Sequence, residues 1–171
     1  MVKLETLLNR IETTPVTMSF LRKRVPEGVS VIAYPNLKGK GRSEVFNGKR
    51  AVVVLIPKKG TKSGHFIVLL PRKRHIEYFS SLGRSPESEL NELHEPLAIF
   101  KNLLGENYIY NRVELQSGKY SIKACGAWVL ARTYLHSLKL NEFVQVFKRR
   151  VILDSPDMLV ATLSLLHFVN Q

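Results

Sequence analysis

Three short segments rich in β-branched and aromatic residues follow one another in the middle of the chain, and they constrain the fold more than any other feature. They are Ala51–Ile56, His65–Leu70 and His75–Ser80. Each has the length and composition of a β-strand, and consecutive strands joined by short loops favour antiparallel pairing. We therefore expect a central, mostly antiparallel sheet.

Segments with a helical spacing of apolar residues lie on both sides of these strands in the sequence. The helical segments are 2–11, 87–104, one that begins near Cys125 and one that begins at Ser155. Tyr108–Leu115 has the pattern of a further strand, whereas prolines and glycines interrupt residues 15–50, where we expect irregular chain with short pieces of structure. This order of elements predicts an α+β fold in which helices flank the sheet.

The length of 171 residues fits one domain over 1–171. Within it we expect an N-terminal helix and irregular region over 1–50, a core over 51–130, and C-terminal helices over 131–171. The longest aliphatic run, Ala51–Ile56, is far too short to span a membrane, and the first residues lack the apolar region of a signal peptide. We therefore expect a protein that is neither membrane-bound nor secreted.

Positive charge is concentrated in one part of the chain. The net charge is +12, and residues 38–74 contain eleven lysines and arginines with Glu44 as their only acid. These cations are Lys38, Lys40, Arg42, Lys49, Arg50, Lys58, Lys59, Lys62, Arg72, Lys73 and Arg74. Such a cluster, without an aromatic RNA-binding motif, favours sequence-independent contact with phosphates. We expect these residues to bind DNA; the alternative is a solubilising surface.

The single cysteine, Cys125, excludes an intramolecular disulfide and a zinc site built on cysteine pairs. No histidine pair has the spacing of metal ligands on a helix, so we expect no metal site. Cys125 lies at the predicted start of a helix, where unpaired N–H groups and the helix dipole lower the pKa of a thiol. It is therefore a candidate nucleophile, and the alternative is a small buried apolar residue.

His65 begins a predicted strand directly after a loop, a place where functional side chains often lie. If residues 71–74 form the loop of a hairpin, the numbers of paired residues sum to 145, and His65 pairs with Ser80. Directly opposed side chains have Cβ atoms about 5 Å apart, so we expect Ser80 to be the group that orients the His65 ring. In this register Glu77 pairs with Val68 on the other face and cannot take that role.

Gln116 follows the predicted strand 108–115 and precedes Cys125 by nine residues. A primary amide at this place can donate an N–H to a developing oxyanion, together with the backbone N–H of Cys125. The alternative is an ordinary loop glutamine.

Four segments in this order resemble the adenain-type cysteine proteases, a superfamily that includes adenovirus maturation proteases and the proteases that remove ubiquitin-like modifiers. They are Gly64-His65-Phe66, Glu77-Tyr78-Phe79-Ser80-Ser81-Leu82-Gly83, Gln116, and Ala124-Cys125-Gly126-Ala127-Trp128. The segments look most like those of virophages and Maverick/Polinton-type elements. The resemblance covers about residues 50–130, and it implies a papain-like arrangement in which His65, Gln116 and Cys125 are catalytic. The family usually has an aspartate where this chain has Ser80.

The resemblance implies a cysteine endopeptidase that processes viral capsid or scaffold proteins during virion maturation. We further expect a monomer inside the virion and the host cell, in the cytoplasm or nucleus, that requires no cofactor and has DNA as a partner and candidate activator. Two alternatives stay open. One is a protease that removes ubiquitin-like modifiers, and the other is an inactive, basic, DNA-binding virion protein, which the serine at position 80 keeps in consideration.

Overall fold

The computed structural model describes residues 16–61, 64–116 and 124–148, so the predicted helices at 2–11 and from Ser155 lie outside the described residues. A five-stranded sheet forms the centre, in the order β1-β2-β3-β4-β5. The strands are β1 (Val29–Ala33), β2 (Ala51–Pro57), β3 (Gly64–Pro71), β4 (Ile76–Phe79) and β5 (Tyr108–Tyr110). The helices are α2 (Met18–Arg22), η1 (Tyr34–Leu37), α3 (Arg42–Phe46), α4 (Pro86–Leu93), α5 (Ala98–Leu104), α6 (Cys125–Tyr134) and α7 (Leu140–Lys148).

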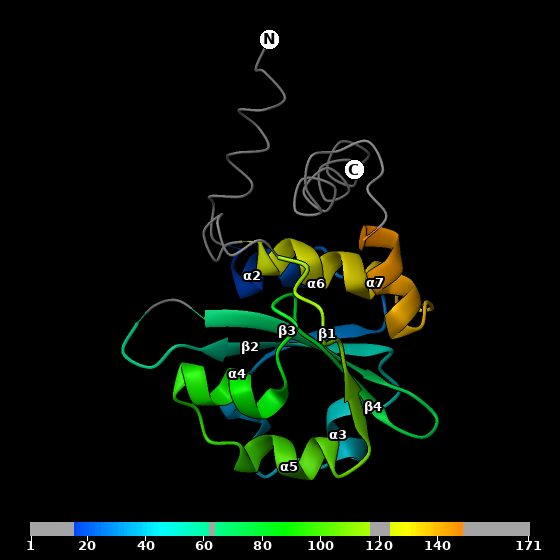
Figure 1. Cartoon of the computed structure of the whole chain (residues 1–171). Coiled ribbons are helices and arrows are strands. Elements are labelled where there is room, and N and C mark those ends of the chain that lie inside the picture. Colours follow the sequence, from blue (N-terminus) through cyan, green and yellow to red (C-terminus); the bar gives the residue numbers. More distant parts are fainter. Residues whose placement is uncertain (1–15, 62–63, 117–123, 149–171) are drawn as a thin grey trace.

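Helices cover both faces of the sheet (Figure 1). Helices α2, α6 and α7 lie on one face, and α3, α4 and α5 lie on the other. Side chains of the central strands alternate between the two cores, as the pleat requires: Val53 packs toward α6, whereas Val52 and Val54 pack toward α4 and α5. The predicted α+β fold, a sheet flanked by helices, is confirmed.

The three central strands are antiparallel to one another, as expected. The two outer strands, β1 and β5, run parallel to their neighbours, which the sequence did not predict. Strand β1 lies within the region expected to be irregular. Its return to β2 passes through η1 and α3, because a parallel neighbour needs a crossover instead of a tight hairpin.

The predicted register of the hairpin between β3 and β4 is wrong by two residues. Leu70 pairs with Glu77 and Pro71 pairs with Ile76, so the paired numbers sum to 147 instead of 145. The reason is that β3 extends through Pro71, which leaves 72–75 as the loop. A shift of two residues keeps each side chain on its face of the sheet, and this matters for the site described below.

The segment 87–104 forms two helices instead of a single helical run. Helix α4 ends at Leu93 and is capped by His94, which has a left-handed φ of 59°, and Pro96 follows before α5 begins. The predicted strand 108–115 is paired only over Tyr108–Tyr110. Directly after Tyr110, the side chain of Asn111 hydrogen-bonds the backbone of Ser80, which follows β4. These side-chain bonds take the place of backbone hydrogen bonds between strands at this position.

Candidate active site

Cys125 and His65, far apart in the sequence, meet in the fold. Cys125 is the first residue of α6, and His65 is the second residue of β3. Both side chains are buried, with exposed fractions of 5% and 3%, and the thiol and the imidazole interact with each other. The structure therefore brings together the predicted nucleophile and the predicted base.

The start of α6 is held by close packing against the N-terminal part of the described chain. Gly126 lies directly against the side chain of Val16, and a Cβ at position 126 would overlap it. Two residues further, Trp128 is fully buried and stacks edge-on against Phe147 of α7. A glycine next to the cysteine thus lets α6 approach its neighbour closely and fixes where Cys125 begins the helix.

The two side chains shift each other's pKa toward the charged pair. Burial alone would raise the pKa of Cys125, but the hydrogen bond and charge of His65, with backbone hydrogen bonds of Phe66 and Gly126, outweigh it and lower that pKa. Burial alone would lower the pKa of His65, but the bond to Cys125 and the charge of Glu89 outweigh it and raise that pKa. An acid with a lowered pKa beside a base with a raised one favours a thiolate–imidazolium pair.

Ser80 lies directly after β4, is fully buried, and places its hydroxyl oxygen 3.1 Å from Nε2 of His65. The expected contact is present although the register is wrong, because a shift of two residues leaves both side chains on one face. Asn111 fixes the backbone here, since its side-chain amide donates to the Ser80 carbonyl and accepts the Ser80 N–H at 3.0 Å. The Ser80 hydroxyl oxygen also accepts the N–H of Leu82 at 3.3 Å.

Gln116 is buried and tied to the same turn. Its backbone N–H donates to the carbonyl of Ser81 at 3.0 Å, and its side-chain oxygen accepts the Ser81 hydroxyl at 2.8 Å. This bond uses the oxygen of the amide and leaves the NH₂ group as the end that can donate to another acceptor. The role of Gln116 toward an oxyanion stays a prediction.

The residue that the sequence analysis missed is Glu89, on α4. Its carboxylate is 1% exposed, Oε1 lies 3.4 Å from Nε2 of His65, and Oε2 accepts the hydroxyl of Tyr78 at 3.3 Å. A signal for it exists in the sequence. The buried side of α4 consists of Pro86, Glu89, Leu90 and Leu93, a spacing that belongs to one helix face, so this glutamate occupies an apolar position.

Glu77 has a different role from Glu89, because it faces α6. Its carboxylate accepts hydrogen bonds from Arg132, whose guanidinium is fully buried, and from Arg72 at 3.1 and 3.2 Å. Arg132 also donates to the carbonyls of Leu135 and Leu138. These bonds tie the end of α6 to β4, so Glu77 is part of the scaffold.

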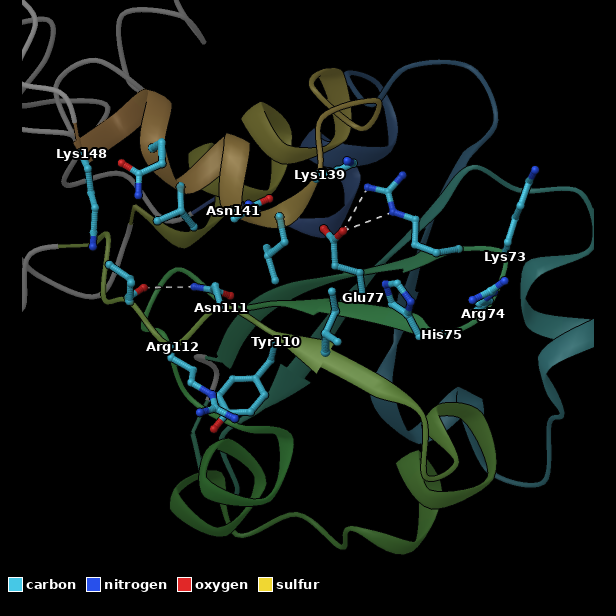
Figure 2. A pocket seen from close by; sticks show the side chains of 16 residues that line it. Lys73, Arg74, His75, Glu77, Tyr110, Asn111, Arg112, Lys139, Asn141 and Lys148 are labelled. Atoms are coloured by element: carbon cyan, nitrogen blue, oxygen red, sulfur yellow. Dashed lines mark hydrogen bonds and ion pairs between the residues drawn. The ribbon is translucent and has the colours of Figure 1, made fainter.

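The structure places the predicted DNA-binding cations in several settings. Lys62 lies outside the described residues, and three others are engaged within the protein: Lys40 with Glu44, Arg42 with the carbonyls of α5, and Arg72 with Glu77. A cavity of about 700 Å³ collects cations from three places in the chain (Figure 2). They are Arg72, Lys73, Arg74, Arg112, Lys139 and Lys148. Contact with DNA stays a prediction.

Two further observations concern the described ranges 16–61, 64–116 and 124–148. Within them, no helix has the length and apolar character that crossing a bilayer requires. In the same ranges, no three histidine, cysteine, aspartate or glutamate side chains are grouped so as to hold a metal ion.

Comparison with known proteins gives similarities at low identity. No protein-family model matches the chain. The uncharacterized protein V9 of Sputnik virophage is 28% identical over 126 residues, which are 66% of this chain and 71% of that protein. Among solved structures, the chain is similar to the central domain of the uncharacterized Lpg1148 protein from Legionella pneumophila, with a TM-score of 0.48, 10% identity, and coverage of 88% of this chain and 96% of that one. It is also similar to the SUMO protease Ulp1 with its catalytic cysteine oxidized to a sulfinic acid, with a TM-score of 0.37, 18% identity, and coverage of 94% and 77%.

Proposed function

We propose that this protein is a cysteine endopeptidase. The observation that carries the proposal is the contact between the Cys125 thiol and the buried imidazole of His65, at the start of a helix and with pKa values moved toward the charged pair. A thiolate is the nucleophilic form of cysteine, and a neighbouring imidazolium can return a proton to a leaving group. The four segments that resemble adenain-type proteases support the same activity.

The geometry suggests how the steps are divided. Nε2 of His65 faces Ser80 and Glu89, whereas Nδ1 has no hydrogen-bond partner among the described residues and is the ring nitrogen left for the thiol. The Cys125 thiolate attacks the scissile carbonyl carbon, and the imidazolium protonates the leaving amine as the C–N bond breaks. His65 then takes a proton from water, which attacks the thioester; the C–S bond breaks, the acid is released, and the thiolate–imidazolium pair is restored.

The negative charge that develops on the carbonyl oxygen needs donors. We propose that the Gln116 NH₂ group and the Cys125 backbone N–H supply them. The Ser81 hydroxyl, bound to the Gln116 oxygen at 2.8 Å, would hold the amide with its NH₂ end outward. Such preorganised donors act on the transition state more than on the substrate.

For substrates, we propose viral capsid or scaffold proteins, cleaved within the virion or the infected cell without a cofactor. The resemblance to virophage-type proteases and the 28% identity with a Sputnik virophage protein support a viral setting. The net charge of +12 and the cations around the cavity of Figure 2 support association with DNA.

The decisive experiment compares wild type with Cys125→Ala on candidate capsid peptides and on a ubiquitin-like fusion. We expect the wild type to cleave capsid peptides and the variant to cleave neither, with an unchanged circular dichroism spectrum. Cleavage of the fusion in preference to the peptides would instead identify a deconjugating protease. Turnover by the alanine variant would exclude Cys125 as the nucleophile.

Alkylation gives an independent test, because iodoacetamide can modify only one cysteine in this chain. We expect rapid reaction at neutral pH that His65→Ala slows and His75→Ala, at the far end of the same hairpin, does not. Slow reaction in the wild type, unchanged by His65→Ala, would refute the protease proposal and favour an inactive DNA-binding protein.

A further inference from the structure

A buried carboxylate on an otherwise apolar helix face calls for an explanation. The inner face of α4 consists of Pro86, Glu89, Leu90 and Leu93, and Glu89 is 1% exposed. Moving an ionised carboxylate out of water is costly unless a counter-charge or hydrogen bonds compensate for it. A leucine at position 89 would continue the apolar stripe without that cost, so packing alone does not account for the glutamate.

The surroundings of Glu89 provide one hydrogen bond and one basic group. Oε2 accepts the Tyr78 hydroxyl at 3.3 Å, whereas Oε1 has no hydrogen-bond partner in the part of the chain that the structure describes and lies 3.4 Å from Nε2 of His65. Among the described residues, His65 is the only basic side chain within ion-pair distance of this carboxylate. Arg84, which also acts on His65, is ion-paired with Glu92.

We propose that Glu89 is a positioning residue that supplies the counter-charge for the His65 imidazolium. Nε2 lies between two oxygens, the Ser80 hydroxyl at 3.1 Å and Glu89 Oε1 at 3.4 Å. The neutral hydroxyl orients the ring, and the carboxylate stabilises its charge. The resemblance leads one to expect a carboxylate at position 80, and in this chain the helix α4 would provide it instead.

The inference rests on the proposed function and adds the residue that sustains the ion pair. Three titratable or charged groups surround this pair. Tyr78, on β4, donates its hydroxyl to the Glu89 carboxylate, and Cys125, on α6, and Arg84, in the loop before α4, act on the His65 ring. Glu87 and Tyr34 act on Tyr78, and Glu87 also accepts the Tyr108 hydroxyl at 2.8 Å. A negative charge next to an imidazole favours its protonated form. Removing the charge of Glu89 should therefore make His65 lose its proton at a lower pH.

The test compares Glu89→Gln with wild type and with Glu87→Gln, a matched loss of one carboxylate on the exposed side of the same helix. The readout is the titration of His65 by NMR of histidine-labelled protein, in which the signal that responds to alkylation of Cys125 identifies the residue. We expect the His65 pKa to fall by about one unit or more in Glu89→Gln and to stay in place in Glu87→Gln. The high-pH limb of peptide cleavage should move down with it.

A purely structural role would give a different result, since Glu89→Gln would lower the Tm and leave the His65 titration in place. That outcome in a folded variant overturns the inference. If the glutamine variant does not fold, Glu89→Asp, which withdraws the carboxylate by one methylene, should shift the titration in the same direction by less. The wild type alone is also informative, because a His65 that is already neutral at neutral pH overturns the inference.

These outcomes are distinguishable from failure of the proposed function. If wild-type Cys125 is unreactive at neutral pH, the protease proposal fails whatever Glu89 does. If wild-type Cys125 is reactive and the His65 titration is unchanged in Glu89→Gln, only the role of Glu89 fails.

Discussion

Replacement of Ser80 by alanine tests how much the orienting hydroxyl contributes to catalysis. The substitution removes the 3.1 Å bond between the hydroxyl and Nε2 of His65 and leaves the N–H of Leu82 without its side-chain acceptor. A neutral hydrogen bond contributes about 0.5–1.5 kcal/mol. Since about 1.4 kcal/mol corresponds to a tenfold change in rate, we expect kcat/KM to fall by at most about tenfold.

The assay is the pH dependence of peptide cleavage and of Cys125 alkylation in wild type, Ser80→Ala and Ser80→Asp. The alanine variant should lower the profile without moving it, because no charge is lost. A new carboxylate at position 80 should raise the His65 pKa and extend activity to higher pH. A loss far beyond tenfold in a folded Ser80→Ala variant would refute the reasoning and make the serine a full member of the catalytic group.

The presence of Glu89 makes the aspartate variant more informative. Two carboxylates at one nitrogen repel each other, so one of them is expected to hold a proton. Ser80→Asp alone should therefore raise the His65 pKa by less than a full second charge would, and Ser80→Asp combined with Glu89→Gln, in which position 80 carries the only charge, should bring the profile back toward that of wild type. If the double variant behaves like Glu89→Gln alone, position 80 is not in contact with the ring in solution.

Three further expectations concern other parts of the molecule. In steady-state kinetics, Gln116→Ala should lower kcat about 10²–10³-fold with little change in KM. A change confined to KM would assign the amide to substrate binding. Glu77→Gln leaves the fully buried Arg132 without its anion and should therefore lower the free energy of unfolding by about 3–5 kcal/mol, measured by urea denaturation. A loss below about 1 kcal/mol would contradict this. The double variant Lys73→Glu with Arg74→Glu should flatten the salt dependence of DNA binding. Peptide cleavage should be unchanged, because both residues lie at the end of the hairpin opposite His65. If the salt dependence of DNA binding is unchanged, these cations form a solubilising surface.

Cys125 and His65, the proposed nucleophile and base, could be singled out from the sequence because each has a local signal. Cys125 starts a helix, and His65 starts a strand after a loop; both features are visible in the sequence. Their contact joins residues that are far apart in the sequence. The resemblance to a protease family predicted that contact, and the residue patterns alone did not.

The contact between His65 and Ser80 was predicted from a register that is wrong. It survives because the error is two residues, and strand side chains repeat with period two. An error of one residue would have placed Ser80 on the α6 face, away from His65, and Glu77 on the face that carries the histidine. The face of a strand residue is therefore a safer prediction from sequence than its exact partner.

Glu89 could not be assigned because its partner depends on where α4 docks. The spacing of Leu90 and Leu93 shows which side of the helix is buried, but only the tertiary structure places that side against the start of β3. The cations Arg112, Lys139 and Lys148 were missed for the same reason, since they join the predicted Arg72–Arg74 cluster only across the cavity. Parallel pairing of β1 and β5 likewise depends on crossovers that local patterns do not fix.

The two buried glutamates differ in how completely their charge is compensated. Glu77 accepts bonds from two arginines, a residue type that stays charged at physiological pH. Glu89 has one tyrosine hydroxyl and one histidine, and the histidine can lose its charge. Because the folded-state pKa of His65 is raised, the stability gained from its charged form is fully present below the unfolded pKa and is lost as the pH rises through the folded pKa. Glu77 and Glu89 thus lie on opposite sides of the sheet: Glu77 holds α6 in place, and Glu89 is the proposed counter-charge of His65.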